Sequence, residues 1–291
     1  MRKEMCTLSL LLLGAIVASA QGPAFVTGLQ GVDRVVLVRD REPTGDTHRA
    51  LGRNQPLPQV ESKPGTQAKP PVFDLDRYQF GILRRGPKWT AESTPETEKI
   101  QVGHMENIGK MAATGKLVAA GPMLDNGDLR GIFLFKVDSV DEAIKLAAED
   151  PAIKAGRLTL ELLTWMAPRG IGARFSEDYR KDPKTRTTMT RYHLAFLRAK
   201  AGEGPPTTSI QEIQLEHLWN IRRMLDSGKL AAAGPFESAG ELRGLFVFAT
   251  TSLEEAKAWA ESDPAVKAGL ATVELHPWLV AKEVWPTGIT K

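Results

Sequence analysis

Apolar and polar positions alternate in two separate stretches of the chain, and each stretch predicts the same series of elements. In the first stretch, Tyr78 to Leu83 alternate as a half-buried strand does. His104 and Met111 fall on one face of a helix that Gly115 ends. The pattern predicts strands over 78–83, 116–120, 131–137 and 158–165 and helices over 96–114 and 140–149. The resulting β-α-β-β-α-β order is typical of a ferredoxin-like unit.

The second stretch repeats the first at a constant offset of 113 positions. The recurring segments begin at His104/His217, Gly115/Gly228, Ala119/Ala232, Leu129/Leu242, Asp150/Asp263 and Trp165/Trp278. Strands are predicted over 192–197, 229–233, 244–249 and 271–278, and helices over 210–225 and 253–261. A repeat of this length indicates one structural unit present twice. The sequence therefore predicts an α+β fold of two tandem ferredoxin-like domains.

The same patterns divide the chain into segments of different character. Residues 41–72 contain six prolines among many polar residues and predict a flexible tether. Val35–Val38 is an apolar stretch that suits an edge strand. The predicted segments are 1–20, a signal peptide; 21–75, an N-terminal extension and flexible linker; 76–168, the first domain; 169–189, a linker; 190–280, the second domain; and 281–291, a C-terminal tail.

The first twenty residues have the three parts of a secretory signal. Arg2 and Lys3 are charged, Leu8–Val17 is apolar but too short to span a bilayer, and Ala18-Ser19-Ala20 offers a cleavage site. We expect cleavage after Ala20, secretion or a periplasmic location, and no membrane attachment afterwards. The one cysteine, Cys6, would leave with this segment, so the mature chain would form no disulfide.

Charge narrows the class of partner. The formal net charge is +3, and basic and acidic residues are interleaved without a lysine or arginine block. This balance argues against nucleic acid as a partner. The expected partner, on the grounds given below, is a small molecule.

His104 and His217 are the candidate acid/base groups, because they are the only histidines that match each other between the copies. Histidine titrates near neutrality and suits general acid or base catalysis. The alternative is a core histidine that one hydrogen bond satisfies.

Asp150 and Asp263 each precede a proline, which is the arrangement of an N-cap followed by the first residue of a short helix. The two roles are compatible, because a capping carboxylate can also accept a histidine N–H and fix its tautomer. Whether either aspartate reaches its histidine does not follow from spacing.

Arg130 and Arg243 precede a glycine at the start of a central strand and are the candidate substrate-binding residues. A guanidinium there could bind a substrate carboxylate or enolate. The alternative is an ion pair with a carboxylate nearby, such as Asp128 or Glu241. Two glutamates within the last strands, Glu161 and Glu274, are expected to point to a solvated face.

Neither a metal nor an organic cofactor is predicted. Each copy offers one retained histidine and dispersed carboxylates, without a closely spaced ligand pair. A glycine-rich phosphate loop and a nucleophile elbow are also missing from the sequence.

The order of motifs resembles the YciI-like (YCII-related) domain family. The features are a histidine in the first helix, "GKLVAAGP", an "R-G-[IL]-F-[LV]-F" strand and "DPA-[IV]-KAG" before a strand that ends in tryptophan. The resemblance implies a dimeric α/β barrel, formed here as an internal pseudo-dimer by the two copies, and leaves further homo-oligomers open. It also implies a lyase- or isomerase-type role for His104/His217 with Asp150/Asp263.

Two hypotheses from different classes follow. The first is a small-molecule site in each copy, where His104 and His217 transfer protons and Asp150 and Asp263 orient them, without a cofactor. The second is a non-catalytic module that binds a small ligand or a protein, in which these residues serve the scaffold. A histidine–aspartate contact of about 3 Å lining a pocket would favour the enzyme.

Overall fold

The computed structural model describes residues 24–26, 69–182, 188–200, 210–237 and 240–286, with only the backbone of 24–26 described. The expected signal peptide, the stretch Val35–Val38 and residues 41–68 of the expected tether lie outside these residues. Residues 69–74, at the end of the tether, contain no helix or strand. No helix in the described part of the chain is long and apolar enough to cross a membrane.

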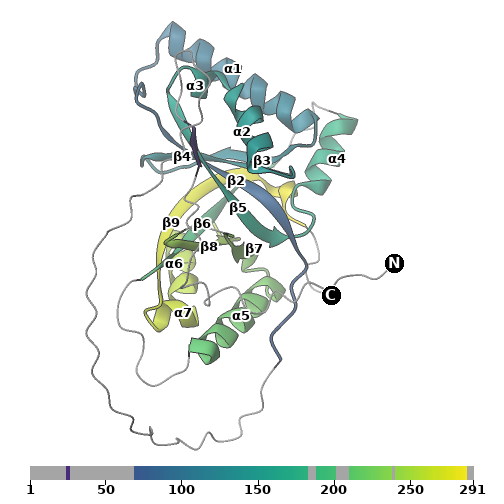
Figure 1. Ribbon diagram of the computed structural model, residues 1–291, viewed down its shortest axis with the longest axis vertical. Helices are drawn as coiled ribbons and strands as arrows, with labels where there is room; N and C mark the ends of the chain where they lie inside the picture. Colours follow the sequence, from purple (N-terminus) through teal and green to yellow (C-terminus); the bar gives the residue numbers. More distant parts are fainter. Residues whose placement is uncertain (1–23, 27–68, 183–187, 201–209, 238–239, 287–291) are drawn as a thin grey trace, which may run out of the picture.

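The first copy is a four-stranded antiparallel sheet with helices on one face (Figure 1). Its elements are β2 (Leu75–Arg85), α1 (Pro95–Ala113), β3 (Leu117–Pro122), β4 (Leu129–Phe135), α2 (Val140–Ala148), α3 (Pro151–Lys154) and β5 (Leu158–Pro168). The strand order is β5-β2-β4-β3, and the short strand β1 (Ala24–Val26) pairs with the outer side of β5.

The second copy repeats this topology. Its elements are β6 (Met189–Ala199), α5 (Ile210–Asp226), β7 (Leu230–Pro235), β8 (Leu242–Phe248), α6 (Leu253–Glu261), α7 (Pro264–Lys267) and β9 (Ala271–Ala281). The order β9-β6-β8-β7 matches that of the first sheet, and the register shift after Leu83 recurs after Leu197. The prediction of two tandem ferredoxin-like units is confirmed.

Polar caps fix where the helices begin. Thr94 and Thr97 form a reciprocal capping box at α1, which satisfies two backbone N–H groups that the helix itself cannot. Ser139 caps α2 and Ser252 caps α6, each through a hydrogen bond from the backbone N–H three residues on. Gly115, with φ at 73°, follows the end of α1 in the left-handed conformation that glycine adopts without strain.

The two sheets pack face to face, and the helices of each copy cover the outer faces (Figure 1). The core between the sheets draws buried residues from both copies, including Phe80 of β2 and Phe196 of β6, whose rings meet edge to face with centroids 6.2 Å apart. Two further cores lie between each sheet and its own helices. The predicted pseudo-dimeric barrel is therefore present within one chain.

A reciprocal pair of hydrogen bonds joins the copies. Trp165 of β5 donates its indole N–H to the carbonyl oxygen of Gly234 at 3.0 Å, and Trp278 of β9 donates to that of Gly121 at 3.0 Å. Both indoles are almost fully buried. These two tryptophans close the last strands of their copies, so the retained Trp is a residue of the interface between the copies.

The glycine at each of these contacts permits a close backbone approach. A Cβ on Gly121 would lie 1.9 Å from the carbonyl oxygen of Leu279, and one on Gly234 would lie 1.7 Å from that of Met166. Strands β3 and β7 do end at the prolines that follow these glycines. The close approach could not be predicted from the sequence, because the backbone that each glycine meets belongs to the other copy.

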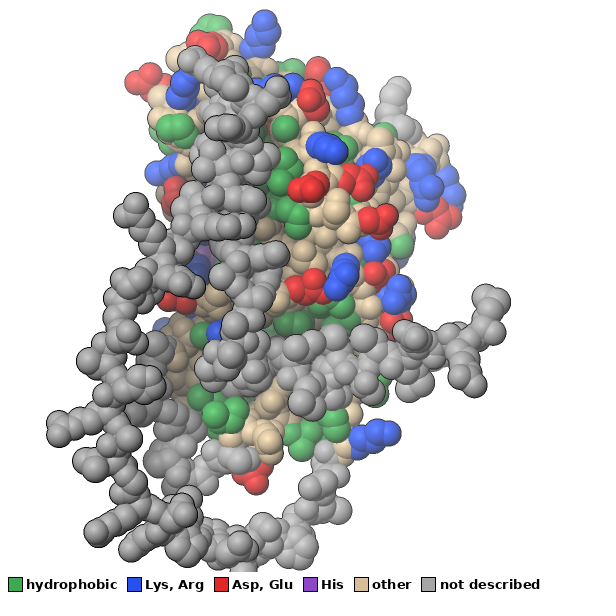
Figure 2. Space-filling model, viewed as in Figure 1, with side chains coloured by type: hydrophobic (Ala, Val, Ile, Leu, Met, Phe, Trp, Pro, Cys, Tyr) green, Lys and Arg blue, Asp and Glu red, His purple; other side chains and the backbone are tan. Residues whose placement is uncertain are grey.

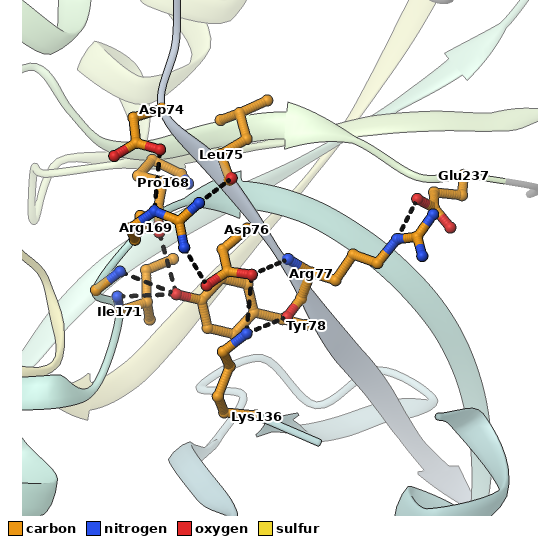
Figure 3. Close-up of polar contacts among 11 residues, drawn as sticks. Asp74, Leu75, Asp76, Arg77, Tyr78, Lys136, Pro168, Arg169, Ile171 and Glu237 are labelled. Atoms are coloured by element: carbon orange, nitrogen blue, oxygen red, sulfur yellow. Dashed lines mark hydrogen bonds and ion pairs between the residues drawn. The ribbon is translucent and has the colours of Figure 1, made fainter. Parts of the chain in front are cut away.

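The segment between the copies is partly helical and is fastened to the first sheet. It carries α4 (Ala173–Lys181), which begins after Gly172. The Tyr78 hydroxyl accepts the backbone N–H groups of Gly170 and Ile171 at 3.1 Å and donates to the carbonyl oxygen of Pro168 (Figure 3). Burial raises the pKa of Tyr78, which keeps this hydroxyl a donor.

Ion pairs surround the same tyrosine (Figure 3). Arg169 binds Asp74 and Asp76, each at 3.0 Å, and Asp76 also accepts Lys136 at 2.9 Å. Burial opposes ionisation of Asp76, but hydrogen bonds from Lys136 and the backbone outweigh it, so the pKa of Asp76 is lowered. These pairs fasten the start of β2 to the end of β5.

The end of the chain also packs into the barrel. A short 3₁₀ helix, η1 (Lys282–Val284), follows β9, and Val284 and Trp285 are buried in the core between the sheets. Trp285 contacts the rings of Tyr192 and Trp278 edge to face. Part of the segment expected as a tail therefore belongs to the core.

Charges of both signs are mixed on the described surface in view (Figure 2). Lysine and arginine side chains alternate there with aspartate and glutamate, and the described part of this face has no extended patch of one sign.

Replacing Gly121 by Ala tests the close approach. Because the new methyl group would meet a backbone carbonyl that cannot move aside, we expect the free energy of unfolding to fall by about 3 kcal/mol or more. Urea denaturation measures this. Gly127→Ala is the matched control, since its Cβ would meet only ordinary contacts, at 3.5 Å or more. Equal stability of the two variants would contradict this explanation.

Candidate functional site

A buried histidine–aspartate pair lies between the first helix and the short helix of each copy. In the second copy, His217 of α5 has Nδ1 at 2.8 and 2.9 Å from the two carboxylate oxygens of Asp263. In the first copy, the distances from His104 to Asp150 are 2.9 and 2.8 Å. The side chains of both aspartates are fully buried, and those of His217 and His104 are 6% and 12% exposed. The contact that the first hypothesis requires is present in both copies.

Each aspartate is also the N-cap of its short helix, as expected. Asp150 accepts the backbone N–H groups of Ala152 and Ile153 at α3, and Asp263 accepts that of Ala265 at α7. The proline that follows each aspartate suits the first helical position. The cap therefore fixes the place where the carboxylate meets the histidine.

An asparagine that the sequence interpretation missed completes each network. Asn107 donates its side-chain N–H to Asp150 at 3.2 Å, and Asn220 donates to Asp263 at 3.0 Å. Each asparagine lies three residues after its histidine, so both side chains leave one face of the helix. The repeat could have revealed these asparagines, because Asn107 and Asn220 are separated by the same 113 positions as the histidines.

An aromatic ring of the sheet supports each histidine. Phe133 of β4 stacks on His104 and Phe246 of β8 stacks on His217, both with centroids 5.9 Å apart. Phe133 and Phe246 are buried in the sheet–helix cores. Each imidazole is thus held by a carboxylate at Nδ1 and by a ring against one face.

In the second copy, the histidine opens onto a cavity of about 280 Å³. The wall is mainly apolar, and two cationic side chains, Arg243 and Lys200, also line it. The planar guanidinium of Arg243 suits a carboxylate ligand. Phe73 and Leu75 also line the cavity, although they precede and begin β2. The second site is therefore completed by a segment of the first copy.

The candidate arginines have different surroundings. Arg243 is exposed and lines the cavity beside His217 in the second copy. The guanidinium carbon of Arg130 lies 4.8 Å from the ring centre of Trp89. Within the described residues neither forms the alternative ion pair with Asp128 or Glu241, and Asp128 binds Arg84 instead at 3.3 Å. That alternative is wrong.

The expectation that Glu161 and Glu274 point to a solvated face is wrong for Glu161, whose side chain is 14% exposed, whereas that of Glu274 is 46% exposed. Both line a second cavity of about 400 Å³ between the two sheets. Glu161 lies 3.6 Å from Arg84, and Glu274 accepts two hydrogen bonds from Arg198. The outer face of each sheet carries helices, so both glutamates lie on the side that faces the other sheet, and Glu274 is still open to solvent there.

His276 joins this inter-sheet cavity and has no histidine counterpart in the first copy. Its two ring nitrogens lie 2.7 Å from Asp125 and 3.0 Å from Glu274. Burial would raise the pKa of Glu274, but hydrogen bonds from His276 and Arg198 outweigh it and lower that pKa.

Among the residues that the structure describes, no three His, Cys, Asp or Glu side chains are grouped so that they could hold a metal ion. His48 lies outside those residues. The histidine–aspartate–asparagine networks offer imidazole, carboxylate and amide groups, and Arg243 adds a guanidinium in the cavity of the second copy.

The family model of the YCII-related domain matches the chain twice, over residues 87–165 and 173–279. The first match includes His104 and Asp150, and the second includes His217 and Asp263. No curated protein and no solved structure matches the chain.

Replacing Asn220 by Ala tests the network. Asn220 is buried, so its loss removes a donor that water does not replace, and we expect the free energy of unfolding to fall by about 1–3 kcal/mol. Asn107→Ala, at the half-buried equivalent, is expected to cost less. Urea denaturation of both variants checks the order, and an equal or reversed effect would contradict it.

The buried His193 predicts a dependence of stability on pH. Burial lowers its pKa, although its hydrogen bond to the Thr250 carbonyl oxygen, at 3.0 Å, opposes this. Between the lowered pKa and the ordinary value of about 6.5, the unfolded chain binds more protons than the folded one. The stability that His193 contributes by staying neutral is therefore complete above about pH 6.5. It is lost as the pH falls from there through the lowered pKa of the folded state.

His193→Gln introduces the residue found at the equivalent Gln79 and should remove this part of the pH dependence. Urea denaturation of wild type and variant at pH 7.5 and 5.5 measures it. An unchanged difference between the two pH values would argue against His193 as the source.

Proposed function

The chain belongs to the YCII-related domain family, and on that premise we propose that it is a cofactor-independent acid/base enzyme acting on a small organic acid, by elimination or isomerisation. The observation that carries the proposal is the second site, where the buried network of His217, Asp263 and Asn220 opens onto an apolar cavity that Arg243 also lines.

The network supports one assignment of protons. Asp263 meets the Nδ1 atom of His217, the amide of Asn220 and the backbone N–H of Ala265, and no described acceptor faces it. A carboxylate among these groups acts as an acceptor, so Nδ1 of His217 carries a hydrogen and donates it. The lone pair of the neutral ring is then on Nε2, which no described residue binds. Nε2 is the atom proposed to take a proton from the ligand.

The cavity supports the class of substrate. Its volume of about 280 Å³ suits a small molecule, and its apolar walls favour a hydrocarbon body. Arg243 can hold a carboxylate by two parallel hydrogen bonds. Once a proton has left the carbon next to a carbonyl group, the same guanidinium can stabilise the charge on the oxygen. A 2-oxo acid with a branched apolar chain combines these features.

His217→Gln tests the proton transfer. We expect wild type in D₂O to accelerate exchange of the C3 protons of 4-methyl-2-oxopentanoate, followed by ¹H NMR, and the variant to lose about 10²–10⁴-fold of that rate. Calorimetric binding of the same acid should change little, because Arg243 and the apolar walls remain. His104→Gln is the matched variant for the first copy.

Two results would contradict the proposal. If wild type binds the acid but exchanges no proton above the buffer rate, the site is a non-catalytic binding module. If His217→Gln loses more than about 3 kcal/mol of unfolding free energy and exchange is unaffected after correction for the folded fraction, the histidine serves the scaffold.

A further inference from the structure

Three arginines surround one tryptophan in the first copy. The guanidinium carbons of Arg130, Arg157 and Arg85 lie 4.8, 5.3 and 5.6 Å from the ring centre of Trp89. These distances are within the range of cation–π attraction. One indole offers little compensation for three positive charges that also repel each other.

The three guanidiniums have no carboxylate partner among the residues whose side chains are described. Arg85 donates to the carbonyl oxygen of Asn126, and Arg157 donates to the carbonyl and hydroxyl oxygens of Thr90, which are neutral groups. Three other arginines of the two sheets do have carboxylate partners: Arg84 binds Asp128 and Glu161, Arg198 binds Glu274, and Arg77 binds Glu237.

Arg130 provides a second and independent observation. Its Nε atom is buried and has no hydrogen-bond partner in the described structure. A buried charged donor left without an acceptor is costly, and native structures rarely retain one without a reason. An acceptor on a bound molecule would satisfy it.

The cluster occupies positions of the first copy that are equivalent to the wall of the His217 cavity in the second copy. Arg85, Arg130 and Arg157 occupy the positions of Ala199, Arg243 and Leu270, which all line the cavity that holds His217. The cluster is therefore expected beside the His104 network. The loop that carries Trp89 is held there by backbone hydrogen bonds from Gly86 and Lys88 to the Arg157 and Gly156 carbonyl oxygens, both at 2.9 Å.

We infer that the first copy contains a binding site for a small anion with two or more negative charges, held by Arg85, Arg130 and Arg157 beside Trp89. A phosphate group and a polycarboxylate share this chemistry, because both offer several acceptor oxygens to guanidinium forks. The corresponding cavity of the second copy is lined by one arginine and one lysine, Arg243 and Lys200, in mainly apolar walls. It lacks three clustered guanidiniums, so we expect it to bind such an anion more weakly. This inference goes beyond the proposed function, because binding requires no proton transfer.

The test is isothermal titration calorimetry of the full chain with sodium pyrophosphate and, separately, with citrate at constant ionic strength. Wild type is expected to bind one anion per chain in at least one of the two titrations, and the stronger ligand identifies the class. Arg130→Met should weaken that binding at least tenfold, the size of a lost charged hydrogen bond. Arg243→Met, the matched change in the second copy, should leave it unchanged.

Two further variants keep the outcome clear. Arg85→Met changes an exposed residue and tests the cluster should Arg130→Met fail to fold, which its melting curve would reveal. His104→Gln should still bind the anion, so failure of the acid/base proposal would leave this result intact. Absence of saturable binding to wild type, or equal losses in Arg130→Met and Arg243→Met, would overturn the inference.

Discussion

The reciprocal contact between Trp165 and Gly234, and between Trp278 and Gly121, holds the two sheets together. Each four-stranded sheet has helices on one face only, so its other face must be covered by something else. The copies cover each other, and the bare glycines let the backbones approach closely enough for the indole N–H groups to reach a carbonyl oxygen. The site depends on this contact, because Phe73, from the first copy, lines the cavity of the second.

The aspartate at each short helix links the fold to the chemistry. Asp263 is buried and caps α7, which places its carboxyl group at a fixed point beside α5. His217 and Asn220 then supply the remaining donors that a buried carboxylate needs. The structural and the functional interpretations of this residue therefore do not compete: the cap positions the group that orients the imidazole.

The sequence predicted what depends on local pattern and on the repeat. Strand order and helix caps followed from periodicity, the Asp-Pro motif and the constant offset. The offset also singled out the histidines and aspartates, but not their contact. The surroundings of Glu161 were misjudged, since alternation separates two faces of a strand without showing what covers each, and the inner face of β5 packs against the second sheet. Asn107 and Asn220 were overlooked despite their offset, because an amide on a helix surface is usually solvated. The cavity walls could not be predicted, because they combine elements far apart in the chain.

The two copies separate the part of the site that the fold requires from the part that can vary. The buried network recurs in both copies with nearly equal distances, since the cap, the helix and the stacked phenylalanine all constrain it. The surrounding wall differs, with arginines at 85 and 157 where the second copy has Ala199 and Leu270. Within one chain, the same histidine–aspartate–asparagine network thus stands beside two surfaces of different charge. Under the two proposals, the ligands of the copies would differ because of these walls rather than because of the network.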